Sequence, residues 1–74
     1  MLQGSALSFA EFQRLILAYG FTLDRIHGSH HVYRHARISD RVNVQPLGKA
    51  AKPYQVGQLR AIITAQGLTL DEDA

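Results

Sequence analysis

Histidine is the residue type in this chain best suited to chemistry, and its distribution is uneven. His30, His31 and His35 fall within the stretch GSHHVYRH, and His27 directly precedes it. A free imidazole has a pKa of about 6.5, so it can accept or release a proton at neutral pH. This stretch is therefore the first place to look for a metal site or for acid–base catalysis.

A metal site at these histidines is disfavoured by the geometry of a strand. Structural zinc sites take four protein ligands and catalytic ones take three. The stretch HHVYRH is β-prone, and neighbouring side chains on a strand point to opposite faces, so His30 and His31 cannot easily share an ion. His31 and His35 would lie about 13 Å apart along the strand. The chain also has no cysteine, and we expect it to need no metal or other cofactor.

Acid–base cleavage of RNA is the chemistry that these residues fit. RNA carries its own nucleophile, the 2′-hydroxyl, so a catalyst needs only a proton acceptor, a proton donor and cations for the phosphate. Eight Lys and Arg against the three acids of residues 1–70 give that part a charge of +5 with His neutral. A body of this charge attracts phosphates. For each histidine taken singly, a surface or packing role remains the alternative.

Two predicted helices flank the histidine stretch. The first begins at Ser8, a good N-cap with Glu11 three residues later as in a capping box, and it ends at Gly20. The second has Pro53 in its first turn and ends at Gly67. Apolar residues recur at helical spacing in both, which predicts one buried stripe per helix. The stripes consist of Phe9, Phe12, Leu15, Ile16 and Tyr19 in the first helix and of Val56, Leu59, Ile62 and Ile63 in the second.

Three short strands are expected between the helices, over 21–27, 30–35 and 41–46, and Pro46 ends the third. Alternation decides which side chains share a face. In the first strand, one face would carry Phe21, Leu23 and Arg25. In the second, one face would carry His30, Val32 and Arg34, and the other His31, Tyr33 and His35. In the third, Val42 and Val44 would lie opposite Arg41, Asn43 and Gln45.

The connections follow from turn-forming residues. We predict a turn at Gly28–Ser29 and a second over 36–40 with Ser39–Asp40 at its tip. Residues 47–52 are expected to form a basic loop of small residues.

The element order predicts an α+β fold of one domain over residues 1–74, with a loose lead-in over 1–7 and a frayed acidic tail over 71–74. The predicted architecture is α-β-β-β-α, a three-stranded antiparallel sheet with both helices on one face, as in the double-stranded-RNA-binding domain. Shape alone does not establish that function. With neither a signal peptide nor a long apolar run, we expect a cytoplasmic protein without membrane contact.

Three stretches resemble the HicA family of bacterial toxins: LILAYGFTLDRIHGSHHVYRH, VNVQP and KPYQVGQLRAIITAQGL. The resemblance extends over residues 9–68, and the specific part is Gly-Ser-His placed eight residues after Gly20-Phe21. HicA proteins are small mRNA interferases with a double-stranded-RNA-binding-like fold, each paired with a HicB antitoxin. The resemblance therefore implies an RNA-cleaving toxin, monomeric when free and hetero-oligomeric with a HicB-type antitoxin.

The same resemblance suggests residue roles. The family's catalytic histidine directly follows Gly-Ser, which points to His30. Arg34 is the best candidate for phosphate because it would share a strand face with His30. The predicted RNA contacts are Ser29, His31, Arg34, Lys49 and Lys52. The third strand departs from the family's usual ending, a Val-Pro followed by His or a basic residue, and the second proton-transfer group stays open.

Two other functions remain open from the residues alone. A domain of this kind could hold structured RNA without cutting it, or it could serve only to bind a partner protein. Tyr33 has two interpretations as well, because aromatic side chains stack on RNA bases but also pack in cores, here beside Val44. Arg60 is a further candidate for the positive surface on charge alone.

Overall fold

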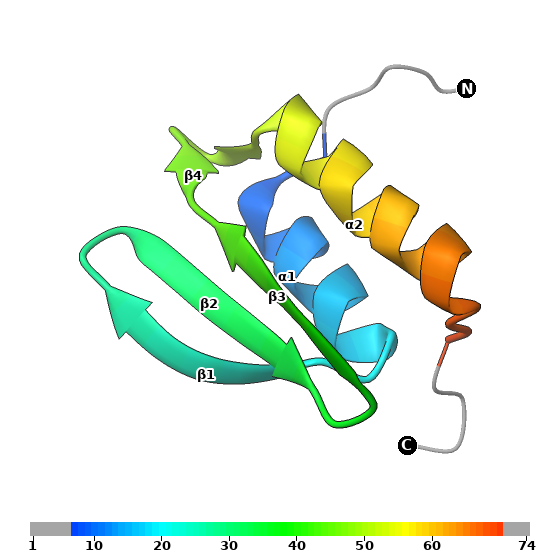
Figure 1. Cartoon of the computed structure of the whole chain (residues 1–74). Helices are drawn as coiled ribbons and strands as arrows, with labels where there is room; N and C mark the ends of the chain where they lie inside the picture. The colour runs from blue at the N-terminus through cyan, green and yellow to red at the C-terminus, as the bar shows by residue number, and fades with distance from the viewer. Residues whose placement is uncertain (1–6, 71–74) are drawn as a thin grey trace.

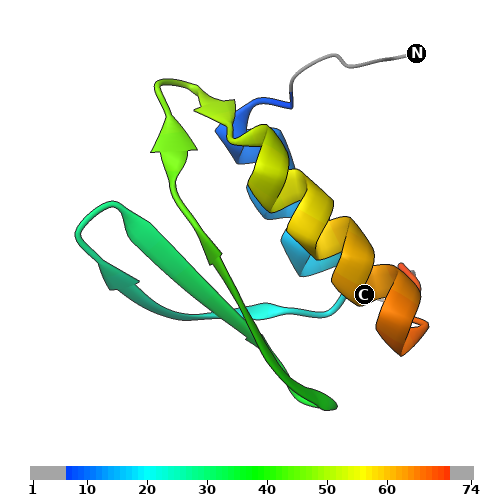
Figure 2. The same cartoon turned by 45° about the horizontal axis from the view of Figure 1, so that its top comes forward.

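The computed structural model describes residues 7–70 and confirms the predicted α-β-β-β-α order (Figure 1). Helix α1 spans Phe9–Ala18 and helix α2 spans Pro53–Gln66. Between them, β1 (Thr22–His27), β2 (His30–His35) and β3 (Ile38–Val44) form an antiparallel sheet in the order β1-β2-β3. Both helices cover the same face of this sheet, as predicted (Figures 1 and 2).

Helix α1 begins with the predicted capping box. Ser8 Oγ accepts a hydrogen bond from the Glu11 N–H at 3.0 Å, and the Ser8 N–H donates to Glu11 Oε1 at 2.9 Å. The backbone hydrogen bond from Ser8, followed by the side-chain one, holds the pKa of the Glu11 carboxyl below its usual value. A carboxyl with a lowered folded-state pKa stabilises the fold near neutral pH, and this contribution is lost as the pH falls through the folded pKa.

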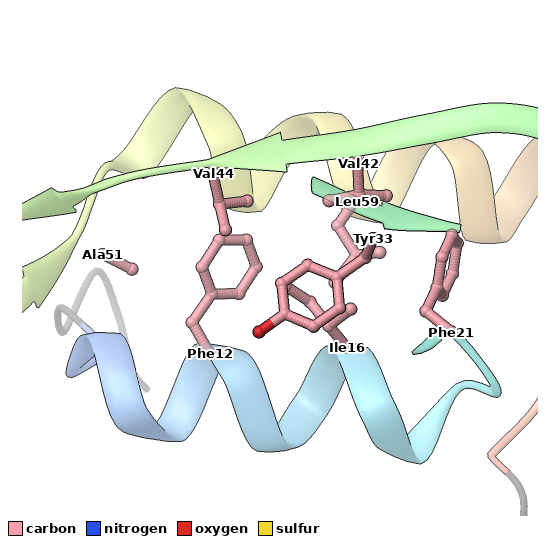
Figure 3. Packing of buried hydrophobic residues seen from close by; sticks show 8 residues of the cluster. All are labelled: Phe12, Ile16, Phe21, Tyr33, Val42, Val44, Ala51 and Leu59. Atoms are coloured by element: carbon pink, nitrogen blue, oxygen red, sulfur yellow. The ribbon is translucent and has the colours of Figure 1, made fainter. Parts of the chain in front are cut away.

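The core lies between the two helices and the face of the sheet that they cover (Figure 3). Tyr33 is 3 % exposed there, and its hydroxyl accepts a hydrogen bond from Gln13 Nε2 at 3.1 Å. Of the two interpretations of Tyr33, core packing is therefore confirmed, and stacking on an RNA base is wrong. The buried apolar residues are Phe12, Ile16, Phe21, Tyr33, Val42, Val44, Ala51 and Leu59.

The connection between β2 and β3 differs from the prediction. His35 pairs with Ile38, so the turn consists of Ala36–Arg37, and Ser39–Asp40 lie inside β3. Ile38 is a β-branched residue that packs against the core, and this favours an early start of the strand. The pairing register shifts between Arg34 and His35, which accommodates the extra residues of β3.

The predicted basic loop over 47–52 is wrong in part, because most of it belongs to a second, two-stranded sheet. Strand β4 (Pro46–Leu47) pairs with β5 (Ala50–Ala51). The hairpin is tied to the start of α1, since the Phe9 N–H donates to the Lys49 carbonyl at 2.8 Å and the Ala51 N–H donates to the Leu7 carbonyl at 2.9 Å. Leu7, assigned to the lead-in by sequence, thus belongs to the fold. The rest of the lead-in and the acidic tail lie outside the described residues.

Helix α2 matches its predicted ends but buries a polar residue that the apolar stripe did not include. Pro53 occupies the first turn, and Gly67 follows the helix in the left-handed conformation with φ 65°. Gln55 is 4 % exposed, and its Oε1 accepts a hydrogen bond from the Gln45 N–H at 3.1 Å. This contact joins the end of β3 to α2. Among residues 7–70, no helix is long and apolar enough to cross a membrane.

Gly28 and Gly57 offer a matched pair of substitutions with opposite expected effects. Gly28 lies in the turn between β1 and β2 with φ 63°, whereas Gly57 lies within α2, and at neither would a Cβ meet another atom within 4 Å. Gly28→Ala should lower the free energy of unfolding by about 1 kcal/mol, because side chains disfavour a positive φ. Gly57→Ala should raise it by up to about 1 kcal/mol. Chemical denaturation measures both, and a stabilising Gly28→Ala would contradict the turn conformation.

Candidate active site

One face of the sheet is turned away from the helices (Figure 2). The side chains on this face are mostly polar and exposed. Directly paired residues of neighbouring strands share a face, so the register identifies its members. We call this surface the open face. It consists of Thr22, Arg25, His27, His30, Val32, Arg34, Arg41 and Asn43. As predicted from alternation, Val42 and Val44 lie on the opposite side, in the core.

His30 is tied to β3 through Asn43. Nδ1 of His30 lies 3.2 Å from Oδ1 of Asn43. A carbonyl oxygen only accepts, so Nδ1 carries the hydrogen, and in the neutral ring Nε2 keeps its lone pair. The His30 side chain is exposed, which leaves Nε2 open to a bound molecule. His30 can therefore accept a proton at Nε2 while its ring is held by Asn43.

A tight turn places a second imidazole beside the first. Gly28 and Ser29 alone connect β1 to β2, and a positive φ at the first of these positions is the pattern of a type II′ hairpin turn. His27 and His30 are the last pair of the ladder and lie directly opposite each other. The Cβ atoms of such partners are about 5 Å apart. Both side chains are exposed, so a ligand can reach the two rings together.

Arginine side chains make the open face positive. Arg34 and Arg41 are paired directly across β2 and β3, and like charges in this arrangement destabilise a sheet. An anion bound between them would relieve this repulsion. Asp24 Oδ2 lies 3.5 Å from Arg25 Nε, and Asp24 Oδ1 lies 3.9 Å from Arg34 Nη1. Ion pairs of this kind, with solvent-exposed arginines, are weak. The open face thus keeps a charge that suits phosphate.

The structure does not bring His31 to the open face. Its half-buried ring lies edge-on to Phe9, with the ring centroids 5.3 Å apart, and its Nδ1 is 3.2 Å from the Ser29 carbonyl. His35 likewise contacts Phe21 edge-on at 5.1 Å. Both histidines therefore pack between the sheet and the α1 side of the fold, at opposite ends of β2.

The other predicted contacts fall in two places. Ser29 directly precedes His30 in the turn, and Arg34 lies on the same strand face as His30 but four residues farther along β2. Lys49 lies in the β4–β5 turn, and Lys52 is the N-cap residue of α2. The β4–β5 hairpin and the β1–β2 turn lie at the same end of the molecule (Figure 1). Within residues 7–70, however, neither lysine side chain forms a hydrogen bond or ion pair with the open face.

The residues of the open face to which the sequence assigned no role include Arg25, His27, Arg41 and Asn43. The register of β1 shifts between Leu23 and Arg25, which leaves Asp24 as an extra residue. This bulge separates Arg25 from the face of Leu23, where simple alternation had placed it. Arg41 and Asn43 could have been found, because alternation in the third strand already put them opposite the valines.

Among the described residues, no three His, Asp or Glu side chains gather that could hold a metal ion.

The fold and the open face define a small α+β domain, like the double-stranded-RNA-binding domain in its element order, with a histidine site on an exposed sheet. A family model described as the HicA toxin of bacterial toxin–antitoxin systems matches residues 9–68. The chain therefore belongs to the HicA toxin family, and this membership implies an antitoxin partner. No curated protein and no solved structure matches the chain.

Proposed function

We propose that this HicA-family toxin is an endoribonuclease, an mRNA interferase, whose active site is the open face. The observation that carries the proposal is the exposed His30 ring, held at Nδ1 by Asn43 with Nε2 open, on the sheet face that also carries the paired Arg34 and Arg41. The Gly28-Ser29-His30 sequence of the HicA toxins supports the same assignment. A ring that is fixed at one nitrogen and open at the other is suited to proton transfer.

In the proposed reaction, His30 Nε2 removes the proton from a ribose 2′-hydroxyl. The 2′ oxygen then attacks the adjacent phosphorus, the bond from phosphorus to the 5′ oxygen breaks, and the upstream product carries a 2′,3′-cyclic phosphate. Arg34 and Arg41 lie four strand positions, about 13 Å, from His30 along the open face, and they bind a neighbouring phosphate of the RNA backbone. Ser29, next to His30 in the turn, contacts the reacting phosphate in this proposal.

The antitoxin partner would be of the HicB type and would cover the open face. Within residues 7–70 no segment lies over this face, so inhibition by occlusion has to come from another chain. A positive surface favours an acidic partner surface, which speeds the encounter more than it raises the affinity. The free toxin would be a monomer and the inhibited form a hetero-oligomer.

A cleavage assay tests the proposed function. The purified chain should cut RNA without any other protein, and addition of its antitoxin should stop the cutting. If the chain instead holds RNA firmly and leaves it intact, it is an RNA-binding module, and the proposed endonuclease activity is wrong. If it neither binds nor cuts RNA, the open face has another purpose.

The salt dependence of RNA binding should locate the phosphate contacts. Each lost phosphate contact reduces the slope of log affinity against log salt by about 1. Arg34→Gln with Arg41→Gln should therefore flatten the slope by up to about 2. Lys49→Ala with Lys52→Ala tests whether the β4–β5 hairpin also contacts the RNA. Arg60→Gln on α2 is the control, and an unchanged slope in the double arginine variant would remove these residues from the site.

A further inference from the structure

We propose that His27 is the second proton-transfer group of the active site, the general acid that protonates the departing 5′ oxygen. This inference rests on the proposed endonuclease function and extends it. His30 alone explains how the nucleophile is activated, but the leaving oxygen also needs a proton at neutral pH. The structure places one more imidazole where it can supply this proton.

The register of the β1–β2 hairpin positions His27. It pairs directly with His30 across the Gly28–Ser29 turn, and both side chains are exposed on the open face. The attacking and leaving oxygens lie on opposite sides of the same phosphorus in an in-line displacement. Two imidazoles whose Cβ atoms are about 5 Å apart can each reach one of these oxygens.

Four other titratable side chains of the sheet are unsuited to this role. His31 and His35 pack on the other side of the sheet, against Phe9 and Phe21. Tyr33 is buried in the core. The Asp24 carboxylate faces Arg25 and Arg34, at 3.5 Å and 3.9 Å, rather than His30. His27, in contrast, pairs directly with His30 and is exposed on the same face.

The surroundings of the two rings also assign their roles. Asn43 accepts a hydrogen bond from His30 Nδ1, which presents Nε2 as the acceptor. The hydrogen bonds found among residues 7–70 include none to the His27 ring. Its imidazolium form can therefore donate from either ring nitrogen and turn toward the leaving group. This difference makes His30 the base and His27 the acid.

The proposed step balances in atoms and protons. The 2′ oxygen forms a bond to phosphorus as its proton passes to His30 Nε2. The bond between phosphorus and the 5′ oxygen breaks as the His27 imidazolium gives its proton to that oxygen. The products are a 2′,3′-cyclic phosphate and a 5′-hydroxyl, and the two rings return to their starting protonation states by exchange with water.

A substrate whose leaving group needs no proton tests the role of His27. The probe is an RNA oligonucleotide with one wild-type cleavage site, made with oxygen or with sulfur as the 5′ leaving atom. On the oxygen RNA, His27→Ala should lower the cleavage rate by about 10²–10⁴-fold, the usual contribution of a general acid. On the sulfur RNA, His27→Ala should cut at a rate within a few-fold of wild type. His30→Ala should stay slow on both, because its loss affects the nucleophile.

The alternative outcomes separate this inference from the function on which it rests. If His27→Ala cuts the oxygen RNA at the wild-type rate, or is slowed equally on both RNAs, His27 is not the acid. If the wild-type protein cuts neither RNA, the endonuclease function itself fails and the role of His27 fails with it. Thermal melts should show that His27→Ala and His27→Gln remain folded, since the His27 side chain is exposed at the end of a hairpin.

Discussion

Replacing His30 by alanine should lower the rate of RNA cleavage by about 10²–10⁴-fold. The substitution removes the ring nitrogen that accepts the 2′-hydroxyl proton. Among the described residues of the open face, no other imidazole is held at one nitrogen by a hydrogen bond that leaves the second nitrogen free to accept a proton. His30 is exposed and makes one side-chain hydrogen bond, to Asn43, so the melting temperature should change little. Single-turnover cleavage and a thermal melt measure the two effects separately.

His31→Ala is the matched control for this variant. The two histidines are neighbours in the chain, but the His31 ring packs edge-on against Phe9 on the other side of the sheet. Its removal should lower the melting temperature and reduce cleavage far less than the loss of His30 does. If His30→Ala cut RNA at the wild-type rate while His31→Ala were inactive, the active site would lie between the sheet and α1.

Replacing Phe12 by alanine should unfold most of the protein. Phe12 has 0 % exposure at the centre of the core, where it lies close to Val44 and Ile16 (Figure 3). Truncation of a buried phenylalanine costs about 3–5 kcal/mol, through lost transfer free energy and the cavity that remains. A core in a domain of this size rarely supplies more than about 3–5 kcal/mol of stability. The folded fraction, followed by circular dichroism, should therefore fall sharply at room temperature.

Leu17→Ala on the same helix provides the comparison. The Leu17 side chain is 49 % exposed, so its truncation should change the free energy of unfolding by less than about 0.5 kcal/mol. Equal destabilisation by the two substitutions would mean that the core does not lie on the Phe12 side of α1.

Local patterns in the sequence were sufficient to predict both helices and to predict which side chains of β2 and β3 lie on each face of the sheet. The capping box of Ser8 and Glu11, Pro53 in the first turn and Gly67 after the last turn act within a few residues, so a sequence reveals them. Alternation in β2 and β3 depends only on the extended backbone, which is why the opposite facing of His30 and His31 was predicted correctly.

Features that depend on pairing between distant segments were not predictable in the same way. The bulge at Asp24 moves Arg25 and His27 relative to Leu23, and it exists only because β1 pairs with β2. The two-residue strands β4 and β5 are held by α1 rather than by their own propensity. The contact of His30 with Asn43 joins two strands and needed the register of the sheet.

Mapping of RNA binding by NMR tests the central claim, that the open face is the RNA site, most directly. The ligand is an RNA oligonucleotide that the wild-type protein cuts, with a 2′-deoxy nucleotide at the cleavage position so that the nucleophile is missing. We predict that the largest shift changes fall on His27–His30, Arg34, Arg41 and Asn43. Changes centred on α1 and α2, with the open face unaffected, would contradict the claim.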